Sequence, residues 1–305
     1  MDRVLDPAQI EALAARAIPR LIFPLPDVFA RRAVRLTDLA NGHAIAGYLL
    51  LAAAIARAQQ AALDALSVPG PTPAEIARAQ AHEMPPLPAR GMRRDPQWRD
   101  VLRGLVRSVA GDPALPGSVG DVCRRLGGAD DAELELVAEH VLDASGTDSD
   151  PAVALFVSAA LQVLWASLAA HLKAADVRLP DSPGPCPVCG TAAVASIVRS
   201  QQPYAGYRYL HCGLCATQWH RVRVECTACS ATHHVAYQSI EGAPPAIRAE
   251  TCEDCHAYRK IFYQEYDAAV EPLADDLASL ALDLMLTETG FHRAGANPLY
   301  WQAPE

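Results

Sequence analysis

Apolar residues recur at helical spacing through the first 180 residues, and short polar or proline-containing stretches interrupt them. Three predicted helices begin at an aspartate followed by proline, at 6–7, 95–96 and 150–151, which places a good N-cap residue before the residue favoured in the first helical turn. Thr72 and Glu75 have the spacing of a capping box, and Asn41-Gly42 is typical of a helix end. The pattern predicts helices over residues 8–17, from beyond Pro26 to about residue 40, over 45–66, from 73, from 96 to about 110, over 130–144 and from 151.

The last of these segments, residues 152–172, is the most apolar stretch of the chain. Two serines, a glutamine and a histidine interrupt it, and its many alanines make it only weakly apolar. We therefore expect a buried helix of a soluble protein rather than a membrane span. The N-terminus opens directly into an amphipathic segment with no secretory signal, which predicts a cytoplasmic protein.

Eight of the nine cysteines form four Cys-x-x-Cys pairs between residues 186 and 255. Twenty-two residues separate the first pair from the second and the third from the fourth, so one spacing occurs twice, 40 residues apart. A Cys-x-x-Cys turn directs two sulfurs at one point, and two such turns close a tetrahedral four-thiolate site. Sequential pairing keeps each loop short, although interleaved pairing is an alternative. The predicted ligands are Cys186, Cys189, Cys212 and Cys215 for one ion, and Cys226, Cys229, Cys252 and Cys255 for a second.

The residues around the cysteines predict strands, because Thr, Val and Tyr recur there at short spacing. Superposing the two copies gives the same order of elements in each: a Cys-x-x-Cys turn (a knuckle), a strand, a loop, a second strand, a second knuckle and a third strand. This order is typical of a rubredoxin-like or zinc-ribbon unit. A linker at 181–185 precedes them, and helical spacing returns over 270–288. The expected fold is multidomain α+β: a helical domain (1–180), two tandem four-cysteine units (181–224 and 225–265), and a C-terminal helix and tail (266–305) packing on them.

The simplest role for both ions is structural, because a unit of about 40 residues buries too little apolar area to fold alone. A catalytic zinc usually keeps an open position, whereas each set here supplies four ligands. Four sulfurs accept zinc or iron, and iron would permit a rubredoxin-type redox carrier. Histidines near the cysteines are expected at the surface or around the ligands, and Cys123 is expected as a small buried residue.

Net charge is −9, and residues 181–265 carry equal numbers of acidic and basic side chains, which argues against a nucleic-acid-binding protein. A zinc-ribbon reader of nucleic acid remains the rival hypothesis, with a face built from Tyr204, Tyr207, Tyr209, Trp219, Arg199, Arg208, Arg221 and Arg223. The basic pairs Arg31-Arg32 and Arg93-Arg94 are expected on a solvated face, with docking of an acidic partner as the alternative. No motif of an enzyme emerges, and Asp275-Asp276 on a helical face has no evident partner.

The cysteine region resembles the formate dehydrogenase accessory protein family, FdhE. The resemblance is carried by residues 208–212, 217–220 and 222–224, by Cys252-Glu253-Asp254-Cys255, and by 260–264, 274–280 and Asn297-Pro298. Upstream, residues 21–24, Arg31-Arg32 and 52–59 are also similar to that family, whereas 67–150 match more loosely.

The resemblance implies a non-enzymatic cytoplasmic maturation factor, needed for formate dehydrogenase activity. Such proteins bind the catalytic subunit of respiratory formate dehydrogenases before its twin-arginine export. The family also resembles rubredoxin-type iron binders, which favours iron over zinc at the eight cysteines. The resemblance implies neither binding to nucleic acid nor insertion into a membrane.

Overall fold

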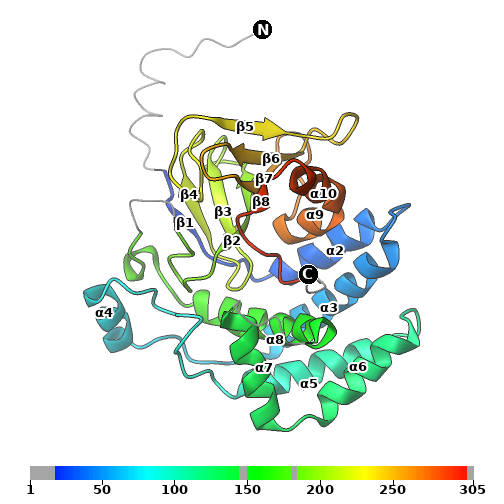
Figure 1. Ribbon diagram of the computed structural model, residues 1–305. Helices are drawn as coiled ribbons and strands as arrows, with labels where there is room; N and C mark the ends of the chain where they lie inside the picture. The colour runs from blue at the N-terminus through cyan, green and yellow to red at the C-terminus, as the bar shows by residue number, and fades with distance from the viewer. Residues whose placement is uncertain (1–17, 144–149, 180–183, 301–305) are drawn as a thin grey trace.

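The helical half of the chain forms a layer beneath a mixed β-sheet in the computed structural model, which describes residues 18–143, 150–179 and 184–300 (Figure 1). Most predicted helices are present, and the helix expected over 8–17 lies outside the described residues. Helix α4 begins with the predicted capping box, in which the Glu75 carboxylate accepts from the Thr72 amide at 2.7 Å. The helices of this half are α2 (Val28–Leu39), α3 (Ala46–Ala65), α4 (Pro73–Ala81), α5 (Gln97–Ala110), α6 (Gly117–Gly128), α7 (Asp131–Asp143) and α8 (Pro151–Ala169).

Helix α6 was not predicted by the hydrophobic pattern. Four of its 12 residues are glycine, which lowers intrinsic helix propensity. It nevertheless forms because Cys123 and Leu126 are buried, and the helix packs against α5. Tertiary packing therefore overrides local propensity here.

Helix α8 lies at the centre of the helical layer and contacts α3, α5 and α7. It is the one helix among the described residues that is long and apolar enough to cross a membrane. However, 83% of its most apolar window is buried inside the protein. The prediction of a core helix is thus confirmed.

The sheet contains strands from both cysteine units and one strand from the N-terminal half. Its order is β1-β4-β3-β2-β7-β6-β5, with β8 beside β7. Each unit forms a three-stranded antiparallel meander, as the superposed copies predicted. The strands are β1 (Leu21–Ile22), β2 (Ala193–Val198), β3 (Arg208–Cys212), β4 (Gln218–Arg221), β5 (Val235–Gln238), β6 (Ile247–Cys252), β7 (Ala257–Tyr263) and β8 (His292–Arg293).

The two units are joined by parallel pairing of β2 with β7, in which Ile197 lies opposite Phe262. The short strand β1 extends the sheet at β4, with Leu21 opposite Trp219. Neither contact was predicted, because both join segments that are remote in sequence. The domain boundaries given above remain predictions. The backbone hydrogen bonds of one sheet run continuously through both cysteine units.

The C-terminal segment forms two helices, α9 (Pro272–Ala278) and α10 (Leu280–Glu288), where the spacing predicted one. The break lies at Ser279, whose hydroxyl donates to the carbonyl of Asp275 at 2.7 Å. The buried Lys260 ammonium donates to the carbonyls of Asp276 (2.8 Å) and Ser279 (3.0 Å). These side-chain donors satisfy the last carbonyls of α9, so the helix can end there.

Helix α9 lies between α2 and the sheet, and it carries the two adjacent aspartates (Figure 1). Both are fully buried, and both have the partners that the sequence did not reveal. Asp275 accepts from Arg35 of α2, and Asp276 pairs with Arg293 and Lys260. The C-terminal segment is thereby tied to the helical layer and to the sheet.

Candidate metal centres

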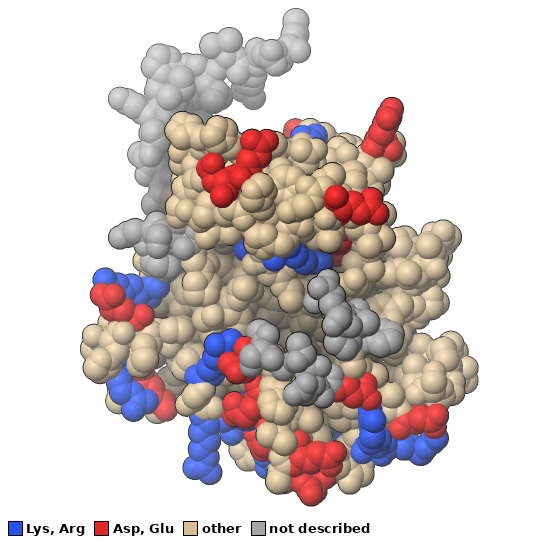
Figure 2. All heavy atoms as spheres, viewed as in Figure 1, with Lys and Arg blue, Asp and Glu red and all other residues tan. Residues whose placement is uncertain are grey.

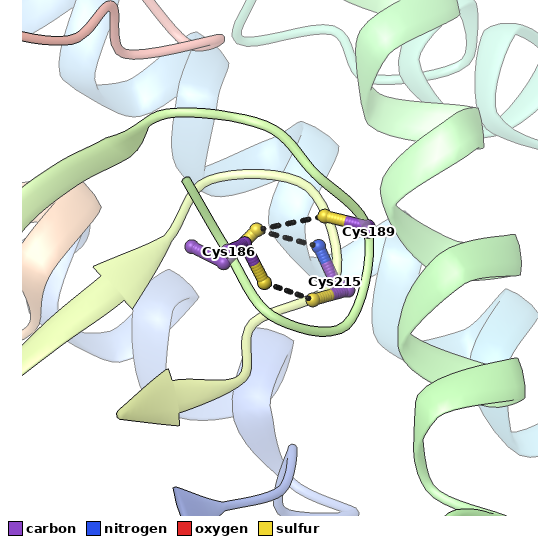
Figure 3. Close-up of side chains that lie close together, drawn as sticks. Cys186, Cys189 and Cys215 are labelled. Carbon is purple, nitrogen blue, oxygen red and sulfur yellow. Dashed lines mark hydrogen bonds between the residues drawn. The ribbon is translucent and has the colours of Figure 1, made fainter. Parts of the chain in front are cut away.

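The first cysteine set lies at the end of the sheet that faces the helical layer. Cys186 and Cys189 precede β2, whereas Cys212 ends β3 and Cys215 precedes β4. The sulfurs of Cys186, Cys189 and Cys215 converge between two loops (Figure 3). The Sγ atoms of Cys186 and Cys215 are 3.5 Å apart, those of Cys189 and Cys212 are 3.4 Å apart, and all four lie within 4.8 Å of one another.

The second set repeats this arrangement at the other meander. The Sγ atoms of Cys226 and Cys255 are 3.7 Å apart, and those of Cys229 and Cys252 are also 3.7 Å apart. The structure therefore groups the cysteines sequentially, not in the interleaved way. A tetrahedron with metal–sulfur bonds of about 2.3 Å has edges of about 3.8 Å, so both sets have dimensions that suit one ion.

The same local backbone forms all four knuckles. The residue after each second cysteine has a left-handed conformation, with φ between 55° and 80°. This turn lets backbone amides approach the sulfurs: the Leu214 and Cys215 amides donate to Cys212 Sγ at 3.4 Å, as does the Ala228 amide to Cys226 Sγ. Amide dipoles directed at sulfur stabilise thiolates. The four left-handed residues are Gly190, Ala216, Ser230 and His256.

Hydroxyl groups distinguish the first set from the second. Thr191 Oγ1 lies 3.2 Å from the sulfurs of both Cys189 and Cys212, and Thr217 Oγ1 lies 3.3 Å from Cys215 Sγ. Sequence analysis missed these threonines, although a comparison of the two cysteine units position by position would have shown them as a difference. The equivalent positions of the second copy, Ala231 and Ala257, carry only methyl groups.

Burial and mutual contact control the protonation of the sulfurs. Burial raises the pKa values of Cys186 and Cys215 well above the usual range. Burial acts in the same direction on Cys212, but hydrogen bonds from the other three cysteines outweigh it and lower its pKa well below that range. Thiolates crowded together repel one another, so in the absence of a cation some of these sulfurs keep their protons. A soft divalent cation would take the place of those protons, and four sulfurs suit zinc or iron.

The surroundings of the two sets differ. All four sulfurs of the first set belong to buried residues, whereas Cys229 is exposed and Cys255 is half-buried. Burial raises the pKa of Cys255 to about 12, while the Ala231 amide lowers that of Cys229. The first set is consequently enclosed and the second is open to solvent on one side.

Contacts from the helical layer enclose the first set. Gln162 of α8 donates to the carbonyl of Gly213, inside the Cys212–Cys215 knuckle, at 2.7 Å. The proline-rich loop before α5 runs beside the other knuckle, where the amides of Leu87 and Ala89 donate to the carbonyls of Val188 (3.0 Å) and Cys189 (2.8 Å). The first centre is therefore part of the interface between the helices and the sheet.

No described histidine joins either four-sulfur set. His211 is buried beside Cys212, and desolvation lowers its pKa to about 4. His234 is exposed, and the hydrogen bond that its ring N–H donates to the Asp254 carboxylate raises its pKa. These positions agree with the expectation of histidines around the ligands or at the surface. Cys123 is buried, as expected, and it belongs to neither set.

The aromatic and basic residues proposed for nucleic-acid binding do not form one exposed face. Tyr209 and Trp219 are fully buried, and Arg208 is buried in an ion pair with Glu250. On the face in Figure 2, acidic and basic side chains of the described residues are interspersed. The rival hypothesis therefore loses the surface on which it depended.

Each predicted basic pair is divided between surface and interior. Arg31 is exposed, whereas Arg32 is buried and its Nε donates to Glu271 at 3.0 Å. Arg93 is exposed, whereas the Arg94 side chain is nearly buried and pairs with two glutamates of α7. The expectation of a solvated face thus holds for the first arginine of the basic pair in α2 and is wrong for the second.

Comparison with known proteins gave matches over almost the whole chain. Residues 18–181 match the family description "FdhE, N-terminal", residues 185–223 match "FdhE, central domain", and residues 224–300 match "FdhE, C-terminal domain".

Individual relatives are similar over most of their length. A protein FdhE homolog of Pseudomonas aeruginosa is 40% identical over 97% of both chains. Another from Pseudomonas putida is 39% identical over 96% of this chain and 93% of its own. The crystal structure of the FdhE protein from Pseudomonas aeruginosa superposes with a TM-score of 0.83 at 37% identity, covering 92% of this chain and 98% of that one.

Proposed function

Because the chain belongs to the FdhE family, we propose that it is a cytoplasmic, non-enzymatic accessory protein for formate dehydrogenase. In this proposal it binds the catalytic subunit before export and is required for that enzyme's activity. The observation that carries the proposal is similarity to FdhE proteins over the helical layer and both cysteine units together. Unoxidised cysteines in four-sulfur sets suit the reducing cytoplasm.

The eight cysteines named above would hold two ions per chain, one in each set, with iron favoured by the family resemblance and zinc as the alternative. Sulfur separations of 3.4–3.7 Å support this assignment. When bound, each ion would supply the positive charge that the clustered sulfurs require. Four cysteine ligands leave no open coordination position on either ion. Each site would therefore be structural, with the cysteines and the bound ion together holding the knuckles and the shared sheet rigid.

Affinity purification from the native host tests the proposed partner. Tagged wild-type protein is expected to retain the catalytic subunit of formate dehydrogenase, identified by mass spectrometry. Deletion of the gene is expected to abolish formate dehydrogenase activity, which the complementing gene restores. Nucleic acid or ribosomal material in place of the catalytic subunit would refute the proposal.

Metal content tests the proposed ligands. The wild-type protein should contain two ions per chain by elemental analysis, and the Cys229→Ser variant should lose one of them. Cys229 is exposed, so this change places no hydroxyl group in the buried core. Cys123→Ala is the matched control, because that cysteine lies outside both sets and its loss should leave both ions in place. Equal metal content in all three proteins would rule out the assignment.

A further inference from the structure

A small cavity lies beside the first cysteine set, on the side of the sheet that carries β1. The segment before α2, the strands β2 to β4 and the segment before α9 surround it. Its volume is about 60 Å³, and Phe23, Val28, Val270 and Pro272 supply much of the apolar lining. Neither the metal centres nor the packing of the helices accounts for its polar residues.

A relay of hydrogen bonds ends at this cavity. The Arg199 guanidinium donates to Gln218 Oε1 through Nε (3.1 Å) and Nη2 (2.6 Å). This contact orients the amide, so that Gln218 Nε2 donates to His211 Nδ1 at 3.1 Å. His211 must then carry its proton on Nε2.

That Nε2–H group has no hydrogen-bond partner among the described residues, although His211 is only 2% exposed and lines the cavity. A buried donor without an acceptor is costly, and buried polar groups in proteins normally have a partner. His211 is part of the cavity lining, so an acceptor held in the cavity is the candidate for the partner that this N–H group lacks.

Positive charge at the cavity is also uncompensated. Arg31 and Arg199 both line it, and neither forms an ion pair with a carboxylate in the described part of the chain. Glu271 lines it too, but its carboxylate already accepts from Arg32, Leu273 and Ala274. Two guanidinium groups beside one N–H donor are complementary to an anionic oxygen pair.

The size of the cavity indicates what kind of molecule carries the anion. Pockets that enclose a whole small molecule have volumes of roughly 300–1,000 Å³, so this one accommodates a single functional group with a short apolar stem. A carboxylate on an aliphatic side chain has that shape. A protein partner can insert such a side chain as an anchor.

We propose that this cavity receives the carboxylate of an aspartate or glutamate side chain from the partner protein. Arg31 and Arg199 supply the positive charge, the His211 Nε2–H donates a hydrogen bond, and the apolar lining contacts the side-chain methylenes. The inference rests on the proposed function in one respect only, namely that a partner protein exists.

Propionate, which reproduces the end of a glutamate side chain, tests the cavity without the partner. In the full chain with ¹³C-labelled histidine, propionate should shift the His211 ring signals saturably, and neutral propionamide should not. Arg31→Glu should weaken propionate binding at least about tenfold, since charge-assisted hydrogen bonds are lost. Arg93→Glu is the matched control, because Arg93 is also exposed. Absence of saturation, or an equal response to propionamide, would overturn the inference.

Retention of the formate dehydrogenase catalytic subunit tests the partner. The wild-type protein and Arg93→Glu should retain it equally, and Arg31→Glu should lose most of it. Equal retention by Arg31→Glu would overturn the docking role whatever propionate does. If the wild-type protein retains no catalytic subunit, the proposed function fails, and the propionate titration alone decides whether the cavity binds a carboxylate.

Discussion

Replacing Arg35 by methionine should strongly destabilise the protein, because Arg35 joins the helical layer to the C-terminal segment. Its Nε lies 3.0 Å from Asp275 Oδ2, and its Nη2 bonds Asp275 Oδ1 at 2.5 Å and Asp267 at 2.7 Å. The Asp275 side chain is completely buried, and the Arg35 side chain is 14% exposed. Methionine keeps the apolar stem and removes the charge.

The expected loss is about 3–5 kcal/mol of unfolding free energy, which is typical when one partner of a buried ion pair is removed. Among the residues that the structure describes, Asp275 would keep only the Glu271 amide as a donor, at 2.7 Å. Urea unfolding followed by circular dichroism measures the change. Arg124→Met is the control, since Arg124 and Asp121 are both well exposed, and such pairs contribute less than about 1 kcal/mol.

The dependence of this loss on pH identifies its cause. Burial raises the pKa of Asp275, and Arg35 opposes that rise. In Arg35→Met the folded-state pKa should rise further, so the folded state binds a proton more readily than the unfolded chain. The deficit should therefore grow as pH rises through the raised pKa and shrink as pH falls toward the ordinary range of aspartate. Combining Arg35→Met with Asp275→Asn should restore part of the stability. A loss below 1 kcal/mol, or one independent of pH, would refute the reasoning.

Two further predictions concern the metal centres and their support. A chelator should remove one ion per chain rapidly and the other slowly, because the second set has an exposed and a half-buried cysteine whereas the first set is enclosed. Elemental analysis at successive times measures the two rates. Loss of both ions at one rate would contradict the prediction. Gln162→Leu should cost about 1–3 kcal/mol, because in the core the Gly213 carbonyl loses its donor and the Gln59 amide loses one of its two acceptors. Thermal unfolding of the loaded protein measures the second effect, and an unchanged midpoint would show that the contact to the knuckle is dispensable.

Sequence reasoning identified the features that depend on neighbours along the chain. The capping box at Thr72 and Glu75, the aspartate cap at Asp150 and the apolar spacing of α8 all formed as predicted, because helix signals act within one or two turns. The grouping of the cysteines also followed from spacing, since each knuckle is a local turn. Helix α6 was missed because its glycines hide a helix that packing stabilises.

Tertiary structure decided how those pieces combine. The pairing of β2 with β7, the addition of β1 and the break at Ser279 all depend on residues far apart in sequence. The same holds for the cavity, where Arg31 meets Arg199 and His211. Local pattern carries the periodicity of each element and the turn of each knuckle, whereas contacts between distant segments are selected by burial and charge pairing once the chain has folded. The sequence alone therefore determined the elements and the two cysteine sets, and only the fold determined the shared sheet, the buried ion pairs and the pocket beside the first centre.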